Sequence, residues 1–439
     1  MSAEAAVNRL LAIHPKGFDL SLDRVLGLLE KLGNPHLEIP PVFHVAGTNG
    51  KGSTSAFLRA ILESAGKTVH VHTSPHLVNW HERYRLGAKD HGVFVSDSVL
   101  EDAIVRAEKA NGGTPITVFE IMSAVGFLLF SEHPADYCVI EVGLGGRFDA
   151  TNVLQNPAAC LITPVGLDHE AYLGNTLGKI AFEKAGIIKS KAPVFVGLQE
   201  DEALGVIEQK VADCRSSIKI ARQDFDFYKQ ADRFVFQDET GLLDLPLPRL
   251  LGDHQIANAA LAIAACRLVI PDLPDQVYED AMEKVVWPGR FECLPAGKLE
   301  KLLPTGAKPQ IWIDGGHNPH AGEAISRELR KSQSENQGSL TMIVGMLTTK
   351  EPEGFFKNFV GLAQKVITIP VSQSDAGFDP AVLAQSAEKV GLNVQTAKSI
   401  EDALMIAGSA GSKVTQRILI CGSLYLIGEV LQKNETPPV

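Results

Sequence analysis

The chain has 439 residues, of which 45% are hydrophobic and 21% are charged, and this balance excludes a disordered or a fibrous protein. The length allows two or three domains, each with its own core. A net charge of −11 at pH 7 argues against broad binding to nucleic acid, although a local basic pocket is compatible with it.

The N-terminus and the cysteines indicate where the protein works. Residues 1–17 lack the charged segment and long apolar run of a secretory signal, and no window is long and apolar enough to span a membrane. The six cysteines are scattered without a Cys-x-x-Cys pair, which predicts reduced, mostly buried thiols. We expect a cytoplasmic monomer with small-molecule partners that binds neither nucleic acid nor membrane.

The stretch 43–58, FHVAGTNGKGSTSAFL, has the pattern of a buried strand, a glycine-rich turn and a helix. Glycines in such a turn allow positive φ angles, so that backbone N–H groups converge on phosphate oxygens at the helix N-terminus. Lys51 adds a positive charge, and the hydroxyls of Ser53 and Thr54 at the start of the helix can reach a Mg²⁺ ion. Gly52 stands where a P-loop has Ser or Thr, and a glycine-rich turn without a ligand is the alternative interpretation.

Apolar runs alternate with helical patterns over the first half of the chain. The predicted strands are 42–46, 68–72, 137–142, 159–163 and 193–197, and the predicted helices include 55–65, 97–110 and 118–131. This alternation indicates βαβ units and a parallel sheet. A charged, aromatic and β-branched stretch at 225–245 predicts an inserted antiparallel hairpin, and a helix follows at 254–269.

The pattern changes at residues 287–309, which contain prolines and glycines with little apolar periodicity. Strands are predicted again at 310–315, 340–346, 365–371 and 417–422, with helices between them. We therefore predict an α/β protein with two domains. Residues 1–295 form a P-loop-containing N-terminal domain with a mostly parallel sheet, and residues 296–439 form a smaller, Rossmann-like α/β domain.

Polar residues follow several of the predicted strands. Glu141 ends an apolar run, and a carboxylate beside a P-loop is typical of the second Mg²⁺ contact, with a solvated charge as the alternative. Asp168 and His169 follow the next strand, and Ser74 and His76 follow a third. A lone histidine is more often structural than a ligand, but a position at the carboxyl end of a strand favours function.

Further candidates are weak when taken singly. Lys184 lies in an apolar helical pattern, where the ordinary interpretation is a surface lysine. Arg290 at the boundary could bring one guanidinium onto a phosphate between the domains, or form a linker salt bridge. The other candidates are His254, which could instead cap a helix, Asn258 one helical turn later, and Asp314 and His317, which could instead form a strand-end turn.

Taken together, nine segments occur in the order seen in one family. They are GTNGKGS, SPHL, EVGLGGRFDATN, LDHEAYLG, EKAGIIK, GDHQIANAALA, PGRFE, DGGHNP and GSLYLIGEVL. In this order and over nearly the whole chain, the sequence resembles the folylpolyglutamate synthase and dihydrofolate synthase family, which is similar in fold and chemistry to the Mur ligases. DGGHN replaces the commoner DGAHN and RFDATN the commoner RLDATN, and neither change removes a functional group.

The resemblance implies an ATP-dependent ligase. The γ-phosphoryl group of ATP would activate a substrate carboxylate as an acyl phosphate, and the amino group of L-glutamate would displace phosphate to form an amide. The implied partners are ATP, Mg²⁺, L-glutamate, dihydropteroate and reduced folates. Members of the family act on dihydropteroate, on reduced folates or on both. We expect both activities, because TVFE and FDAT resemble the pterin pocket of bifunctional bacterial members and FDLSLDRV resembles their substrate-contacting N-terminal helix.

The resemblance also implies roles for single residues. The ATP-binding set is Thr48, Asn49, Gly50, Lys51, Gly52, Ser53, Asn258, Arg290, Asp314 and His317. The metal ligands would be Ser53, Ser74, Glu141 and His169, and the pterin pocket would include Thr117, Phe119, Asp149 and Ala150. Lys51, His169 and Lys184 would be catalytic, with Lys184 matching a carbamylated lysine and Phe119 stacking on the pterin ring.

Two other functions were weighed. A Mur-type ligase of cell-wall synthesis carries a large N-terminal domain for a uridine nucleotide, but only 46 residues precede Gly47 here. A P-loop nucleotide switch needs a guanine-specificity element such as Asn-Lys-x-Asp, and no such string occurs in this sequence. ATP consumed in proportion to glutamate added would separate a ligase from a switch.

Overall fold

The computed structural model describes residues 3–13, 21–303, 310–335, 339–408 and 416–438. The chain divides into two compact units, Met1–Arg249 with Gln255–Val286, and Leu250–His254 with Trp287–Val439. Residues 287–295, which the sequence pattern placed in the first domain, therefore cluster with the second unit. The predicted α/β class is confirmed.

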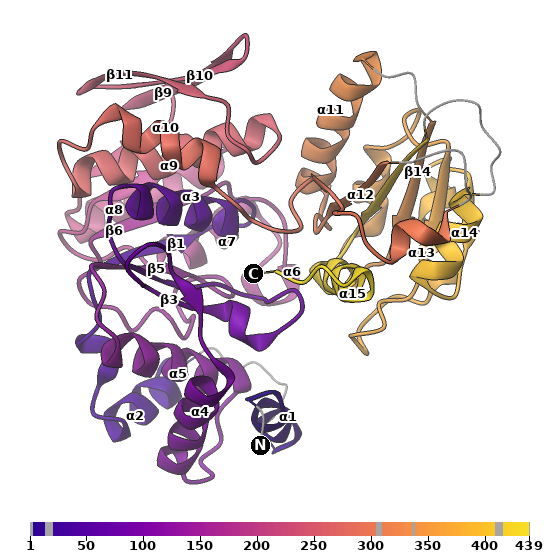
Figure 1. The fold of residues 1–439 in the computed structure, drawn as a ribbon. Coiled ribbons are helices and arrows are strands. Elements are labelled where there is room, and N and C mark those ends of the chain that lie inside the picture. The colour runs from indigo at the N-terminus through magenta and orange to yellow at the C-terminus, as the bar shows by residue number, and fades with distance from the viewer. Residues whose placement is uncertain (1–2, 14–20, 304–309, 336–338, 409–415, 439) are drawn as a thin grey trace. The chain divides into compact units, whose positions relative to one another are not determined.

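A mixed, mostly parallel sheet of eight strands forms the centre of the first unit, in the order β4-β3-β2-β5-β1-β6-β7-β8 (Figure 1). Strands β2, β5, β1, β6, β7 and β8 run parallel to one another. At one side of the sheet, β3 pairs antiparallel with β2 and also with β4. The five strands predicted here are confirmed. The bounds are β1 (Val42–Ala46), β2 (Val69–His72), β3 (Tyr84–Leu86), β4 (Val93–Phe94), β5 (Tyr137–Glu141), β6 (Ala159–Ile162), β7 (Val194–Val196) and β8 (Ile218–Ile220).

Helices cover both faces of this sheet, as Figure 1 shows. One face carries α1 (Ala3–Ile13), α2 (Asp23–Lys31), α4 (Asp97–Asn111) and α5 (Val118–Glu132), whose apolar side chains share a core with β1 and β5. The other carries α3 (Lys51–Ser64), α9 (Asp253–Val269) and α10 (Asp275–Lys284). Next to β6 and β7 pack α6 (Glu170–Leu173), α7 (Leu177–Ala185) and α8 (Asp201–Cys214). Both faces of the parallel strands are therefore buried, as their apolar runs predict.

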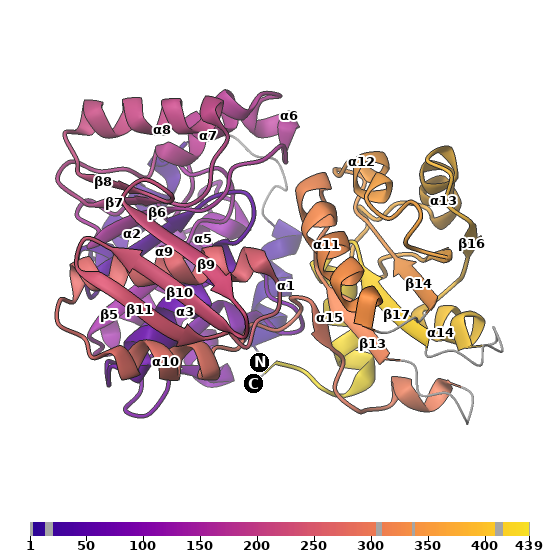
Figure 2. The same cartoon turned by 90° about the horizontal axis from the view of Figure 1, so that it is seen from above.

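The predicted hairpin is a three-stranded antiparallel sheet, so the prediction was wrong in strand number (Figure 2). Its strands are β9 (Phe225–Gln230), β10 (Arg233–Asp238) and β11 (Gly241–Pro246). The chain reverses twice because it can turn at Ala231, with φ 53°, and again at Gly241, with φ 129°. The Asp238 side chain supports the second turn by accepting hydrogen bonds from the backbone and the hydroxyl of Thr240.

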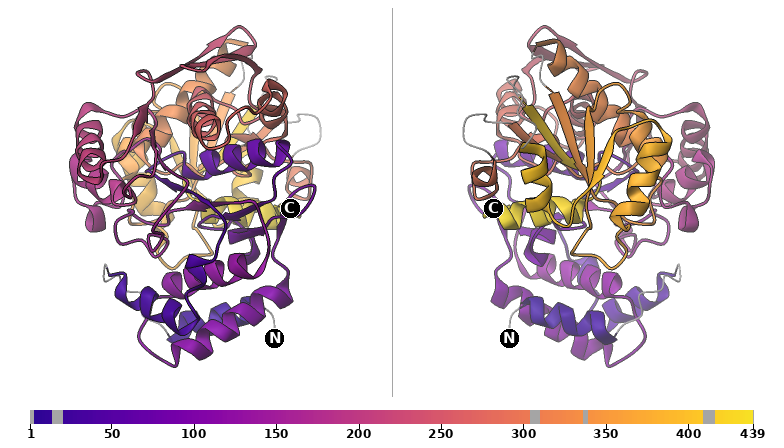
Figure 3. Two further views of the ribbon diagram at one scale, coloured as in Figure 1. Left: turned by 90° about the vertical axis from the view of Figure 1, so that its left-hand side faces the viewer. Right: turned by 90° about the vertical axis from the view of Figure 1, so that its right-hand side faces the viewer.

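The second unit contains a six-stranded sheet in the order β12-β13-β17-β14-β15-β16, parallel except for β12. Its strands are β12 (Glu292–Cys293), β13 (Gln310–Asp314), β14 (Ser339–Val344), β15 (Lys365–Thr368), β16 (Val394–Thr396) and β17 (Gln416–Cys421). Helices flank it on both sides, as the right-hand view of Figure 3 shows: α11 (Pro319–Glu335), α12 (Pro352–Lys357), α13 (Pro380–Lys389), α14 (Ile400–Gly408) and α15 (Leu424–Asn434). The four strands predicted here are confirmed.

Three short 3₁₀ helices complete the described elements: η1 (Pro35–Leu37), η2 (Trp80–Arg83) and η3 (Leu299–Leu302). Within the described ranges, no helix combines the length and the apolar character that crossing a membrane requires. All six cysteines are free thiols. The first part of the FDLSLDRV segment, residues 18–20, lies outside the described residues, as do residues 304–309 of the predicted boundary.

Candidate active site

The glycine-rich loop lies between β1 and α3, and α3 begins at Lys51 rather than at the later hydroxyl residues that the sequence suggested. Gly47 and Gly50 have φ angles of 148° and 91°. A Cβ atom at Gly47 would lie 1.8 Å from Thr163 Oγ1, and one at Gly50 would lie 2.4 Å from Asn258 Oδ1. Only glycine therefore lets the loop pack this closely against the end of β6 and against α9.

Two lysine ammonium groups meet at one carbonyl oxygen of this loop. Lys51 Nζ donates hydrogen bonds to Gly47 O at 3.0 Å and to Thr48 O at 3.2 Å, and Lys184 Nζ on α7 donates to Gly47 O at 2.8 Å. Lys184 is buried, so the alternative of a surface lysine is excluded. Two positive charges held this close favour the binding of an anion beside the loop.

The backbone of the loop is tied to the segment that follows β6. The N–H groups of Thr48 and Asn49 donate to Pro164 O at 3.0 and 3.3 Å, and the Thr48 hydroxyl both donates to and accepts from the backbone of Gly166 at 3.0 Å. Asp168 and His169 come directly after this segment, and His169 N donates to Asp168 Oδ1 at 2.8 Å. The structure thus places His169 on a segment anchored to the glycine-rich loop.

The residues predicted to bind metal follow the carboxyl ends of four neighbouring parallel strands, β2, β5, β1 and β6. Glu141 ends β5 opposite Val45 of β1, and its side chain is only 5% exposed. In the described part of the chain no group of three His, Cys, Asp or Glu side chains forms a metal site by itself. Mg²⁺ is often held by one or two protein oxygens together with substrate phosphates, so a buried carboxylate such as that of Glu141 fits this ion.

The loop that carries Ser74 is held by one carboxylate. Glu82 accepts hydrogen bonds from three consecutive backbone N–H groups, those of Leu77, Val78 and Asn79, at 2.7, 2.9 and 2.7 Å. Three backbone donors on one carboxylate form a strong local anchor. Ser74 therefore lies at the start of a loop whose shape is fixed by its own residues.

The histidine of the SPHL segment has a structural role. Arg83 Nε donates to His76 Nδ1 at 2.9 Å, and the Arg83 guanidinium lies 4.2 Å from the centre of the Trp80 ring. Burial, and next the Arg83 charge, lower the pKa of His76 to about 3, so the imidazole stays neutral and accepts this hydrogen bond. His76 helps to close the loop around Trp80.

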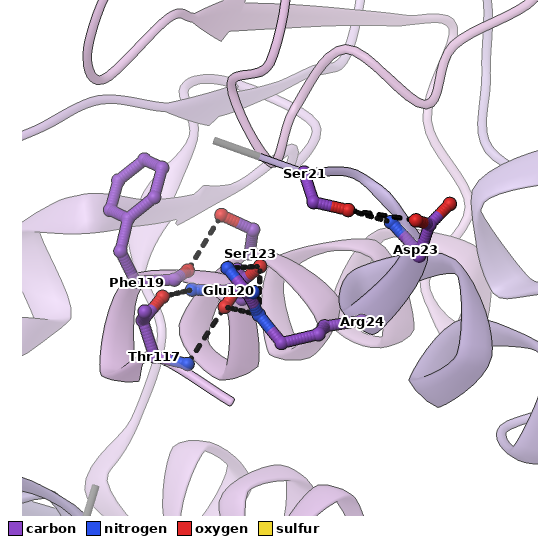
Figure 4. A network of polar contacts seen from close by, with 7 residues as sticks. All are labelled: Ser21, Asp23, Arg24, Thr117, Phe119, Glu120 and Ser123. Atoms are coloured by element: carbon purple, nitrogen blue, oxygen red, sulfur yellow. Dashed lines mark hydrogen bonds and ion pairs between the residues drawn. The ribbon is translucent and has the colours of Figure 1, made fainter. Parts of the chain in front are cut away.

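Figure 4 shows a polar network at the start of α5. Thr117 and Glu120 form a reciprocal cap, in which Thr117 Oγ1 accepts from Glu120 N at 3.2 Å and Glu120 Oε2 accepts from Thr117 N at 2.7 Å. Arg24 on α2 donates from Nε to both carboxylate oxygens of Glu120, at 3.1 and 3.2 Å. The Phe119 ring points away from this ion pair (Figure 4), so the pair fixes the helix end from which the ring projects.

The ring of Phe119 lies against the second glycine-rich loop, which follows β5. A Cβ atom at Gly143 would lie 2.2 Å from Phe119 Cζ, so only glycine fits beside the ring. Asp149 closes this loop by accepting from Leu144 N at 2.9 Å, from Thr151 N at 2.9 Å and from Thr151 Oγ1 at 2.6 Å. The structure therefore brings Phe119 against the loop that Asp149 closes, and Phe119 packs against the apolar cluster that includes the buried Ala150.

Predicted ATP contacts of the second unit gather at the end of β13. Asp314 accepts from Phe291 N at 2.8 Å and from Gly316 N at 2.6 Å, and His317 Nδ1 lies 2.8 Å from Gly315 O. A Cβ atom at Gly315 would lie 2.6 Å from Arg290 Nη1, so Arg290 lies against the same turn. Burial raises the pKa of Asp314, and the charge of Arg290 opposes this shift.

Two family models match the chain, the Mur ligase middle domain over residues 45–266 and the dihydrofolate synthetase C-terminal domain over residues 301–433. The dihydrofolate synthase/folylpolyglutamate synthase of Haemophilus influenzae is 31% identical over 426 residues, which are 95% of this chain and 94% of the relative. The chain belongs to the dihydrofolate synthase/folylpolyglutamate synthase family.

Solved structures of relatives in this family have the same fold over nearly the whole chain. The structure of Escherichia coli FolC in complex with DHPP and ADP is 30% identical, covers 98% of this chain and 97% of its own, and superposes with a TM-score of 0.87. That of the bifunctional Yersinia pestis enzyme complexed with AMPPNP and Mn is 27% identical, covers 98% of both chains and has a TM-score of 0.85. The resemblance inferred from the ordered motifs is confirmed.

Three features were not predicted from the sequence. They are the anchor formed by Glu82, the ion pair of Arg24 with Glu120, and the buried hydrogen bond of His44 with Thr151. Glu82 and Arg24 lie in polar stretches where charged side chains are usually solvated. His44 did give a signal, because it interrupts the apolar run VFHVA of a fully buried strand. A polar side chain buried in a strand needs a hydrogen-bond partner, so this position indicates a buried polar contact.

Proposed function

We propose that this chain attaches L-glutamate both to dihydropteroate and to the γ-carboxylate of reduced folates, with ATP as the source of free energy. Glutamate ligation to pteroates or folates is the activity of the family to which the chain belongs. The use of both acceptors is the further step that we propose. The observation that carries the proposal is the meeting of Lys51 and Lys184 at Gly47 O, in the loop after β1, while the buried Glu141 ends the neighbouring strand β5. These groups would suit a polyphosphate and its metal ion.

The proposed reaction has two balanced steps. A carboxylate oxygen of the acceptor attacks the γ-phosphorus of ATP, which forms an acyl phosphate and releases ADP. The amine nitrogen of glutamate then attacks the acyl carbon, so that an amide forms and inorganic phosphate and a proton leave. Lys51 would stabilise negative charge on the transferred phosphoryl group, and the main contributions of the protein would be positioning and electrostatics.

The metal and nucleotide contacts belong to the same proposal. Mg²⁺, when bound, would neutralise charge on the phosphate groups, held by Ser53, Ser74, Glu141 and His169. In the first unit the proposed nucleotide contacts are Thr48, Asn49, Gly50, Lys51, Gly52, Ser53 and Asn258. In the second unit the residues proposed as ATP contacts are Arg290, Asp314 and His317. The position of Asn258 Oδ1 against Gly50 supports its place in this set.

The pterin contacts and the modification of Lys184 are also proposals. Thr117, Phe119, Asp149 and Ala150 would surround the pterin ring, with Phe119 as the stacking side chain. Carbamylation of Lys184 would convert a positive group beside Gly47 into an anionic metal ligand. Intact-protein mass spectrometry at neutral pH with and without bicarbonate would detect the added mass of one CO₂ molecule.

A product assay tests the function directly. The purified chain is supplied with ATP, Mg²⁺ and L-glutamate, and either dihydropteroate or tetrahydrofolate is added separately. We expect a glutamylated product from each acceptor by mass spectrometry, with one ADP formed for each glutamate added. Product from tetrahydrofolate alone would reduce the proposal to one activity, and no glutamate-dependent ADP with either acceptor would overturn it. Light scattering during gel filtration would test the proposed monomer.

A further inference from the structure

His44 lies in the middle of β1, the strand that leads into the first glycine-rich loop. The residue is completely buried, and its Nε2 atom lies 3.0 Å from Thr151 Oγ1. Thr151 follows the second glycine-rich loop, 107 residues further along the chain. One hydrogen bond therefore joins the strand of the nucleotide side to the loop of the predicted pterin side.

The direction of the hydrogen bonds follows from the single proton of the threonine hydroxyl. Thr151 Oγ1 donates this proton to Asp149 Oδ1 at 2.6 Å. Thr151 Oγ1 must then accept from His44, which places the ring proton on Nε2. Burial lowers the pKa of His44 to about 3, so the imidazole is neutral and carries one proton.

The other ring nitrogen of His44 makes burial of the imidazole unfavourable by itself. Nδ1 is buried and has no hydrogen-bond partner among the described residues. An unpartnered buried polar atom is unfavourable, and an apolar side chain in this strand would avoid it. The hydrogen bond from Nε2 to Thr151 is the favourable contact that an apolar side chain at this position could not make.

This hydrogen bond acts on the shape of the second glycine-rich loop through Asp149. The Asp149 carboxylate also accepts from the backbone of Leu144, next to the Gly143 that contacts the Phe119 ring. His44 and Thr151 thus form a hydrogen-bonded chain that ends at the carboxylate closing the loop.

We propose that His44 is a positioning residue that, through Thr151, orients the Asp149 carboxylate and so sets the affinity for the pterin ring of the acceptor without contacting it. The inference rests on the proposed function, since it assigns the pterin side of that site. It predicts an effect on the acceptor and not on ATP, although His44 lies on the strand that leads into the nucleotide loop.

Two matched pairs of variants test the inference. His44→Phe keeps a planar ring but removes the donor, and His44→Gln returns an N–H group close to the position of Nε2. Thr151→Val removes the hydroxyl, and Thr151→Ser keeps it. For His44→Phe and Thr151→Val we expect the KM for dihydropteroate to rise about tenfold, the scale of one hydrogen bond to a charged network, while the KM for ATP and kcat change less than about twofold. His44→Gln and Thr151→Ser should lie within about threefold of the unchanged chain.

The outcomes separate this inference from the proposed function. A wild-type chain that glutamylates no acceptor would overturn the proposed function and the inference with it. An active wild type with an unchanged dihydropteroate KM in His44→Phe and Thr151→Val would overturn the inference alone. Equal increases in the KM for ATP and for dihydropteroate, or removal variants that both fail to fold by circular dichroism, would assign the hydrogen bonds to stability and also overturn it.

Discussion

The two glycine-rich loops of the first unit follow neighbouring strands, and they are held by groups of opposite charge. Residues 47–50, after β1, are held through backbone carbonyl oxygens by the ammonium groups of Lys51 and Lys184. Residues 143–151, after β5, are held through backbone N–H groups and a hydroxyl by the carboxylate of Asp149. The strands β1 and β5 are paired in the sheet, so the two loops leave the same edge.

This difference shows why glycine content alone does not identify a phosphate site. At the first loop two positive charges are concentrated beside the start of a helix, where an anion is favoured. At the second loop the charge of Asp149 is engaged by its own loop and buried, so the surface offered next to Phe119 suits an uncharged ring.

Removal of the first positive charge should have the largest effect. For Lys51→Ala we expect turnover to fall about 100-fold or more in a folded protein, because one preorganised charge contributes roughly 3–4 kcal/mol to a transition state. The measurement is glutamate-dependent ADP formation at saturating substrates. Lys229→Ala, an exposed lysine on β9, is the control. Near-normal activity of folded Lys51→Ala would exclude this lysine as a phosphate contact.

Removal of the second lysine should have a different effect from removal of the first, because the two lysines would play different roles. We expect Lys184→Ala to lose most activity, roughly tenfold or more, and to recover part of it when acetate or formate replaces the missing carbamate. Lys51→Ala should not respond to these acids. ADP formation is measured over a series of acid concentrations. Full activity of Lys184→Ala without added acid would show that no carbamate is needed.

Replacement of the Asp149 carboxylate at the second loop should weaken the binding of the pterin acceptor. Burial raises the pKa of Asp149, and the hydrogen bonds from Thr151 and Leu144 oppose this shift. An amide in Asp149→Asn turns an N–H group toward a loop donor, so we expect the free energy of unfolding in urea to fall by about 1–3 kcal/mol. The KM for dihydropteroate should rise and the KM for ATP should stay unchanged. Asp232→Asn, exposed between β9 and β10, is the control, and an equal loss in this control would contradict the role.

The smallest expected effect concerns acid stability. The pKa of His44 is about 3 in the folded chain, chiefly through burial, with Lys189 and His72 adding to it, and about 6.5 when unfolded. Between these values only the unfolded chain binds the proton, so acidification from pH 7 to pH 5 lowers stability. His44→Gln should lose less stability over this range, by at most about 2 kcal/mol. Urea unfolding at both pH values measures it, and identical losses in both proteins would contradict the buried neutral ring.

The fold was largely predictable because its central strands are buried on both faces and therefore form continuous apolar runs. Strands 42–46 and 137–142 were found for this reason. The short edge strands β3 and β4 were not predicted, since two or three residues leave no period to detect. The start of α3 was placed too late because Gly50, with φ 91°, ends the loop directly before Lys51, and no sequence pattern specifies that angle.

The candidate site was predictable where residues follow strands or lie in ordered motifs. Glu141 was predicted as a metal ligand from its place at the end of a buried run. The structure shows that it ends β5 and is buried, and its role with a metal stays a prediction. The burial of Lys184 could not be inferred, because Glu183 beside it makes this part of α7 resemble an exposed helix. The chain from His44 through Thr151 to Asp149 was also missed, since its first two members are 107 residues apart and only the folded sheet brings them together.

The carboxylate of Glu82 orders the loop after Ser74 when the chain folds, before any ligand binds. A loop that becomes ordered only when its ligand arrives must meet the loss of conformational entropy at that moment, and the affinity falls accordingly. The loop after Ser74 has three consecutive backbone N–H groups already bound to Glu82. Its entropy is lost when the chain folds, so a metal ion that binds at Ser74 would meet a rigid partner and keep the full free energy of its own contacts.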